Sequence, residues 1–275
     1  MTQTGAVTHR QIAVPQTGMT IHVATFASPA ADARPLVMLH GIWDTWRTFE
    51  RAALRLAAGR PIHALDLRGH GDSSKPAEGY AHADYATDVL GVLDALGLDR
   101  PDLLGFSLGS MVATRLVGDH PERVARLILE DPPYSPDADP RGRRAWIATL
   151  LDLKQQPFED VVEGLAELNP TRDRATNELS ARALINTADG PFKATLDPER
   201  SRFDLPAALA RFTLPTLILR ADPQVGGAMS QVGCDACVAA NPAARLVEFP
   251  GCGHLIHAER EDAFVAAVED FLADD

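Results

Sequence analysis

Short apolar runs that alternate with helical stretches are the feature that most restricts the fold of this 275-residue chain. The runs 36–39, 62–67, 124–129 and 217–219 consist mainly of Leu, Ile, Val, Met and Ala. Segments with apolar residues at helical spacing, such as 84–96, lie between them. Parallel strands that are buried on both faces have this continuous apolar character. The pattern therefore predicts an α/β fold with a mostly parallel central sheet flanked by helices.

Two regions depart from this rhythm. Near the start, strand-like runs flank Pro15-Gln16-Thr17-Gly18, which predicts an antiparallel hairpin. The segment 132–210 is rich in Pro, Asp and Arg and has only helical patches. We therefore predict an α/β core made of residues 1–131 and 211–275, with residues 132–210 forming a helical lid inserted after the sixth strand.

The overall charge limits the classes of partner. Lys and Arg number 26 against 38 Asp and Glu, which gives a formal net charge of −12. This balance opposes binding to nucleic acid or to an anionic membrane, and it leaves a small-molecule substrate as the expected partner. The N-terminal sequence lacks the features of a signal peptide, and no apolar run is long enough to span a bilayer. We expect a cytoplasmic protein, and the sequence leaves its oligomeric state open.

The motif Gly105-Phe106-Ser107-Leu108-Gly109 falls between a predicted strand and a predicted helix. In a nucleophile elbow of the type Gly-x-Ser-x-Gly, the glycines allow a tight turn that lifts the serine hydroxyl above the sheet. The start of the following helix offers unpaired N–H groups and the positive end of the helix dipole. Ser107 is therefore the candidate nucleophile, and the backbone N–H of Leu108 is a candidate donor to a developing oxyanion.

Two further motifs complete a recognisable pattern. His40-Gly41-Ile42-Trp43 directly follows an apolar strand, and the segment 66–73 follows the next one. With the serine motif, they resemble the α/β-hydrolase family along nearly the whole chain. The resemblance implies that the N–H of Ile42 is the second oxyanion donor and that segment 66–73 has a structural role. It also implies that His254, between the last strand and the last helix, is the general base. For His257, just after it, we expect a residue that packs or faces solvent and has no catalytic role.

The acid that would orient His254 is the uncertain member of the set. Relatives usually carry it just after the seventh strand, but Gln224 stands at the expected position. Asp222, two residues earlier, is our preferred candidate. Glu130 is the alternative, since some family members supply the acid from the end of the sixth strand, and a glutamate that closes an apolar strand needs a partner. Asp131 ranks third.

The cysteines permit a competing hypothesis. Cys234, Cys237, Cys252 and His254 have side chains that zinc prefers, and the first pair has the spacing of a metal-binding turn. Cysteines three residues apart on a predicted helix are more often small buried apolar residues. Zinc would also occupy the histidine that the serine requires. We therefore expect no metal ion and no organic cofactor.

These features favour a serine hydrolase that cleaves a carboxylic ester or lactone of a small, hydrophobic molecule through an acyl-enzyme. Trp43, Trp146 and Phe158 are candidate substrate contacts. The alternatives are a ligand-binding receptor that keeps the triad, a thioesterase, a carbon–carbon bond hydrolase and a cofactor-free haloperoxidase-like enzyme. Dehalogenases and epoxide hydrolases of this fold use an aspartate where this chain has Ser107.

Overall fold

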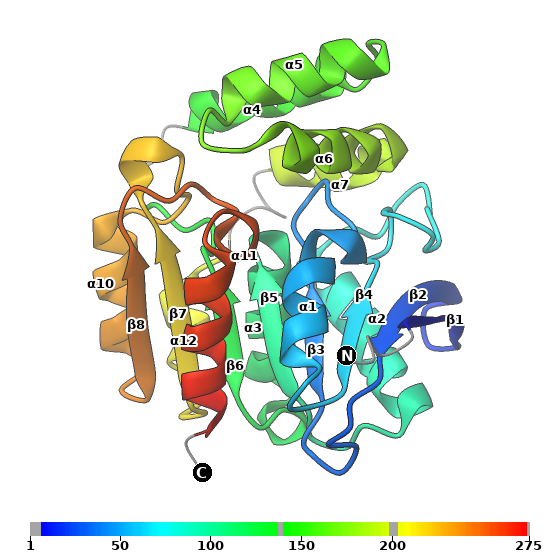
Figure 1. The fold of residues 1–275 in the computed structure, drawn as a ribbon, viewed down its shortest axis with the longest axis vertical. Helices are drawn as coiled ribbons and strands as arrows, with labels where there is room; N and C mark the ends of the chain where they lie inside the picture. Colours follow the sequence, from blue (N-terminus) through cyan, green and yellow to red (C-terminus); the bar gives the residue numbers. More distant parts are fainter. Residues whose placement is uncertain (1–6, 137–139, 198–202, 274–275) are drawn as a thin grey trace.

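The computed structural model describes residues 7–136, 140–197 and 203–273. Its centre is an eight-stranded sheet with the strand order β1-β2-β4-β3-β5-β6-β7-β8 (Figure 1). Strand β2 pairs antiparallel with β1 and β4, and all the other pairs are parallel. The strands are β1 (Val7–Val14), β2 (Met19–Phe26), β3 (Leu36–Leu39), β4 (Ile62–Leu65), β5 (Asp102–Phe106), β6 (Leu127–Glu130), β7 (Thr216–Ala221) and β8 (Ala244–Phe249).

The predicted opening hairpin is confirmed. Strands β1 and β2 pair in register from Val7 with Phe26 to Val14 with Met19. In the turn, the N–H of Gly18 donates to the carbonyl of Val14 at 2.9 Å. Gly18 has a φ of +69°, a conformation that glycine adopts without a steric penalty.

Helices cover both faces of the sheet, as Figure 1 shows. One face carries α1 (Glu50–Leu56), α11 (Ile256–Glu259) and α12 (Glu261–Ala273), and the other carries α2 (His82–Leu96), α3 (Leu108–Asp119) and α10 (Gln231–Ala240). Each face has its own hydrophobic core cluster. The central strands β3, β5 and β6 are buried at every position, which explains their continuous apolar sequence. The predicted α/β-hydrolase type of fold is confirmed.

Four helices of the segment between β6 and β7 lie above the carboxyl ends of the parallel strands (Figure 1). They are α4 (Pro140–Leu153), α5 (Phe158–Leu168), α6 (Arg174–Asn186) and α7 (Asp189–Leu196), and they share a third hydrophobic cluster. The short helix α9 (Leu205–Leu209) instead packs on α3 and α10 of the core. The limits of the lid at residues 132 and 210 remain a prediction.

Two 3₁₀ helices bear on the site, η1 (Trp46–Phe49) before α1 and η3 (Pro223–Val225) after β7. Thr45 caps η1 through its side chain, which accepts the N–H of Arg47. No helix in the described part of the chain has the length and apolar character needed to cross a bilayer.

Candidate active site

Ser107 occupies a sharp turn between β5 and α3. Its φ of +51° is unusual for a residue with a side chain, and it marks the strained backbone of a nucleophile elbow. The glycines on either side permit the close approach. A Cβ on Gly105 would lie 2.2 Å from the carbonyl oxygen of Gly109, and one on Gly109 would lie 2.1 Å from that of Leu39. The predicted strand–turn–helix context of the serine is confirmed.

His254 reaches the same turn from the loop after β8. Its ring packs on that of Phe106, next to Ser107, with the ring centroids 4.7 Å apart. Its Nδ1 lies 2.5 Å from Oδ2 of Asp131, a fully buried carboxylate. The hydroxyl of Ser107 makes no hydrogen bond to His254 here, and such contacts are often long before substrate binds.

Asp131, and neither Asp222 nor Glu130, is the carboxylate beside His254, which corrects the order of preference drawn from the sequence. Asp131 directly follows β6 and has a φ of +39°, so the chain turns there. Its carboxylate also accepts the N–H groups of Ala221 at 3.3 Å and Ala228 at 2.7 Å. The end of β7 and the loop after it therefore hold the carboxylate of Asp131 in place beside His254.

Asp222 has a different task in that loop. Its side chain accepts the N–H groups of Gln224 and Gly251, each at 2.9 Å. These two hydrogen bonds, first that of Gly251, lower the pKa of the Asp222 carboxyl. Asp222 thus joins the loop after β7 to the turn after β8, from which His254 follows.

Glu130 pairs with the other histidine of the region. Both of its carboxylate oxygens lie within 2.9 Å of Nδ1 of His257, and one also accepts the N–H of that residue. On the far side of the ring, Nε2 of His257 lies 2.8 Å from the hydroxyl of Thr48. Both members of the pair are completely buried. The sequence predicted that Glu130, at the end of an apolar strand, needs a partner. It has one, but that partner is His257 and not His254.

The two predicted oxyanion donors lie at the same end of the sheet. Leu108 is the first residue of α3, so no carbonyl lies four residues earlier in that helix to accept its N–H. Ile42 is positioned by His70, whose Nε2 lies 2.5 Å from the carbonyl of Ile42. Both Ile42 and Leu108 line a cavity together with Ser107.

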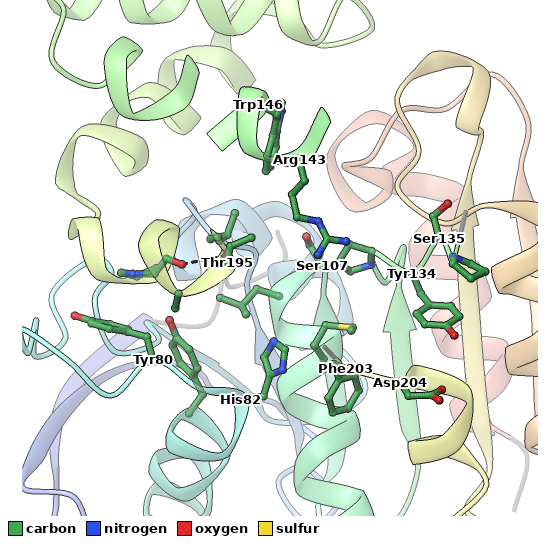
Figure 2. Close-up of a pocket in the computed structure, with 18 residues that line it drawn as sticks. Tyr80, His82, Ser107, Tyr134, Ser135, Arg143, Trp146, Thr195, Phe203 and Asp204 are labelled. Carbon is green, nitrogen blue, oxygen red and sulfur yellow. Dashed lines mark hydrogen bonds between the residues drawn. The ribbon is translucent and has the colours of Figure 1, made fainter. Parts of the chain in front are cut away.

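This cavity of about 550 Å³ lies between the core and the helices above it. Figure 2 shows Arg143 and Trp146 reaching down from α4, with Tyr80, His82 and Phe203 on the opposite side. Burial, with a smaller contribution from the charge of Arg115, lowers the pKa of His82 to about 4, so its imidazole is neutral at pH 7. The wall is thus largely apolar and aromatic, as small-molecule sites usually are.

Of the predicted substrate contacts, only Trp146 lines this cavity. Trp43 is 7% exposed and packs against Trp146 with the two rings tilted and their centroids 5.0 Å apart. Phe158 lies on α5 under the guanidinium of Arg182, 4.6 Å from its ring. Trp43 and Phe158 therefore support the upper helices and do not form the cavity wall, which corrects the prediction for both.

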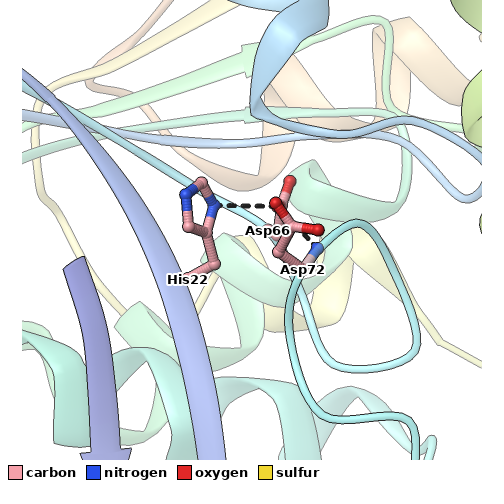
Figure 3. A group of neighbouring side chains, drawn as sticks. All are labelled: His22, Asp66 and Asp72. Atoms are coloured by element: carbon pink, nitrogen blue, oxygen red, sulfur yellow. Dashed lines mark hydrogen bonds and ion pairs between the residues drawn. The ribbon is translucent and has the colours of Figure 1, made fainter. Parts of the chain in front are cut away.

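The segment 66–73 braces the loops around the site, in agreement with the structural role expected for it. Asp66 accepts the N–H groups of Trp46 at 2.8 Å and Asp72 at 3.0 Å, and it forms an ion pair with His22 (Figure 3). His22, Asp66 and Asp72 are the only group in the described chain whose ligand atoms are near enough to share a metal ion. Since the Asp66 carboxylate already has three partners, we assign this group to loop packing.

The cysteine hypothesis finds no support in the arrangement of the side chains. Cys234, Cys237 and Cys252 are all buried free thiols, and they are not among the described clusters that could hold a metal. Burial raises the pKa of Cys237 and of Cys252 to about 12, which disfavours the thiolate that zinc binds.

A strained serine, a histidine with a buried carboxylate partner and two candidate amide donors thus meet at the carboxyl end of the sheet. The model of the family described as "Alpha/beta hydrolase family" matches residues 36–267. The chain belongs to the alpha/beta hydrolase family. The matched residues begin at β3, the first strand of the parallel part of the sheet, and end within α12 of this hydrolase.

Curated relatives and solved structures agree with this assignment. The hydrolase is 27% identical over 251 residues to a 2-(acetamidomethylene)succinate hydrolase of Mesorhizobium japonicum, covering 86% of this chain and 87% of the relative. It is 29% identical over 262 residues to a 2-hydroxymuconate semialdehyde hydrolase of Pseudomonas sp. strain CF600, covering 87% of each. The structure of an esterase from Exiguobacterium antarcticum matches with a TM-score of 0.80 at 22% identity, over 98% of this chain and 100% of the other, and shows the shared fold.

Proposed function

We propose that this alpha/beta hydrolase cleaves a carboxylic ester or lactone of a small, mainly hydrophobic molecule through an acyl-enzyme on Ser107. The observation that carries the proposal is the 2.5 Å contact between His254 and the buried Asp131, made beside a serine with a φ of +51°. Ser107 also opens on an apolar cavity of about 550 Å³, which has room for a small organic substrate.

In the proposed reaction, Oγ of Ser107 attacks the carbonyl carbon while Nε2 of His254 takes the hydroxyl proton. Asp131 accepts the hydrogen bond of Nδ1, fixes the tautomer and stabilises the imidazolium. The N–H groups of Ile42 and Leu108 receive the negative oxygen. The proton then passes to the leaving alcohol. Water, deprotonated by the same histidine, releases the acid and restores the serine.

An active-site probe and a substrate panel test the proposal together. A fluorophosphonate should label the wild-type protein, and Ser107→Ala should abolish the labelling. The neighbouring Ser110→Ala is the matched control, because Ser110 does not line the cavity and its hydroxyl donates to the backbone carbonyls of Gly105 at 2.6 Å and Glu130 at 3.2 Å. A panel of p-nitrophenyl esters and of lactones should contain at least one compound that the wild type hydrolyses and Ser107→Ala does not. Labelling without turnover of any member would favour a receptor over an esterase.

A second candidate is hydrolysis of a carbon–carbon bond next to a carbonyl group. It is favoured by the 29% identity to the 2-hydroxymuconate semialdehyde hydrolase, which covers 87% of both chains. The same serine, histidine and aspartate can serve either reaction. Turnover of 2-hydroxymuconate semialdehyde, followed by its absorbance, against turnover of the esters decides between the two. A kcat/KM at least tenfold higher for the semialdehyde would replace the ester proposal.

A further inference from the structure

The charge inside the cavity carries information about the substrate. Among the described residues that line the cavity, Arg143 and Asp204 have side chains that are charged at pH 7. Asp204 caps α9, where its carboxylate accepts the N–H of Ala207 at 3.0 Å. Asp204 therefore stabilises the start of α9, whereas no such structural role accounts for the position of Arg143 in the cavity.

Arg143 has no hydrogen bond or ion pair to any residue in the described part of the chain. Two other arginines of the upper helices are engaged: Arg174 pairs with Glu159 at 2.6 Å, and Arg182 stacks on Phe158. Arg144 also has no hydrogen bond or ion pair in the described part of the chain, but it does not line the cavity, so the position of Arg143 in the cavity is what sets it apart. The chain has 38 acidic residues against 26 Lys and Arg, so acidic partners are plentiful. Arg143 is also exposed, so its guanidinium is accessible to an anion from outside the protein.

The direction of the side chain adds a second observation. Arg143 belongs to α4, and Figure 2 shows its guanidinium extending from that helix down toward Ser107. It lines the same cavity as the serine, next to Trp146. A substrate that fills the cavity would displace water from its apolar and aromatic walls, and this would strengthen the attraction between the guanidinium and an anionic group of that substrate.

A guanidinium presents a planar fork of donors that matches a carboxylate in a bidentate contact. We propose that Arg143 binds a carboxylate of the substrate, so that the molecule cleaved at Ser107 is a hydrophobic acid and not a neutral compound. A single guanidinium balances one carboxylate, whereas a phosphate monoester carries about −1.5 to −2 and would leave charge uncompensated in an apolar cavity. This inference rests on the proposed function and narrows its substrate class.

Matched substrates and matched variants test the inference. The substrates are mono-p-nitrophenyl esters of the linear diacids from succinate to adipate, each compared with its methyl ester, which lacks the charge. The variants are Arg143→Met, which keeps an unbranched stem like the alkyl part of arginine but lacks the guanidinium, and Arg143→Lys, which keeps the charge without the fork. Arg144→Met is the control, since Arg144 is also exposed on this helix but does not line the cavity.

For the diacid of best length, wild type should prefer the free carboxylate over its methyl ester by about 10- to 100-fold in kcat/KM, the range expected for hydrogen bonds to a charged group. Arg143→Met should lose this preference mainly through KM, Arg143→Lys should keep part of it, and Arg144→Met should keep it all. Equal rates on both members of every pair, unchanged in Arg143→Met, would overturn the inference.

Binding measurements separate this inference from the proposed reaction. Free glutarate and adipate, added in millimolar amounts, should raise the thermal unfolding temperature of wild type and Arg144→Met but not of Arg143→Met. This result would hold even if no ester were cleaved, in which case the proposed reaction fails and the carboxylate site stands. Conversely, if the esters are cleaved and Arg143→Met changes neither the rate nor the thermal shift, the proposed reaction stands and the carboxylate site fails.

Discussion

Two histidine–carboxylate pairs lie side by side at the end of β6, and their surroundings separate their roles. In one, Asp131 holds His254, whose side chain is 17% exposed and whose Nε2 has no partner among the described residues. In the other, Glu130 holds His257, which is fully buried and has Thr48 at its Nε2. A carboxylate at Nδ1 is therefore not enough to mark a catalytic histidine. The free second nitrogen beside the serine turn makes the difference.

The largest effect should come from the pair beside Ser107. Asp131→Asn keeps the shape of the side chain but removes the charge that stabilises an imidazolium, so kcat should fall roughly a thousand- to ten-thousandfold. The measurement is kcat on the ester found in the panel, with circular dichroism to show that the variant folds. A fall of less than tenfold would remove Asp131 from the proposed mechanism.

A change in the buried pair of Glu130 and His257 should lower the free energy of unfolding and leave kcat nearly unchanged. Glu130→Gln leaves His257 without its charged partner in a dry site, and breaking such a pair costs about 3 kcal/mol of unfolding free energy. The kcat of the folded variant should stay close to that of wild type. Urea unfolding and turnover of the same preparation give both numbers. If Glu130→Gln loses kcat as severely as Asp131→Asn, the division of roles between the pairs is wrong.

A third histidine shows what happens without a carboxylate partner. Burial, with a smaller contribution from His40, lowers the pKa of His70 to about 4 from an ordinary value of 6.5. Between these two pH values His70 binds a proton in the unfolded chain but not in the folded chain. The free energy of unfolding should therefore fall as the pH drops from 6.5 to 4. The contribution is at most about 3 kcal/mol. His70→Gln should make this part of the stability curve shallower, although the pKa values of His63 and His82 are also lowered to about 4 and these histidines still contribute to it. The exposed His120→Gln should leave the slope unchanged.

The smallest effect is expected at Asp222, which contacts neither histidine. Asp222→Ala removes the acceptor for Gln224 and Gly251, so it should loosen the loop connection and lower kcat far less than Asp131→Asn does. The reason is that Asp222 acts on His254 only through the backbone. Steady-state kinetics of the two variants side by side are the measurement, and equal losses would restore Asp222 as a candidate acid.

Much of the fold can be predicted from the sequence because a buried strand is visible as a short run of apolar residues. The run Leu36–Leu39 is buried at all four positions, and the hairpin around Gly18 depends on one turn. The nucleophile turn is local as well, since Gly105 and Gly109 are needed within the same few residues. Such features need no knowledge of distant segments.

The candidate cavity wall was harder to predict. Trp43 and Phe158 are large apolar residues near the site, and the sequence does not tell whether such side chains face a cavity or a neighbouring helix. Trp43 is covered by Trp146 and Phe158 by Arg182. Nothing in the sequence distinguishes Arg143 from the neighbouring Arg144, because only the packing of α4 decides which of the two side chains faces the cavity.

The sequence by itself determined the strand segments and the serine turn, because each depends on residues close together in it, and the resemblance to the family pointed to His254. Tertiary structure decided which carboxylate meets that histidine. Glu130 and Asp131 are neighbours, yet the chain turn at Asp131 directs their side chains to different histidines, and the N–H groups of Ala221 and Ala228 hold Asp131 in place. These contacts join positions about a hundred residues apart, and no local pattern encodes them.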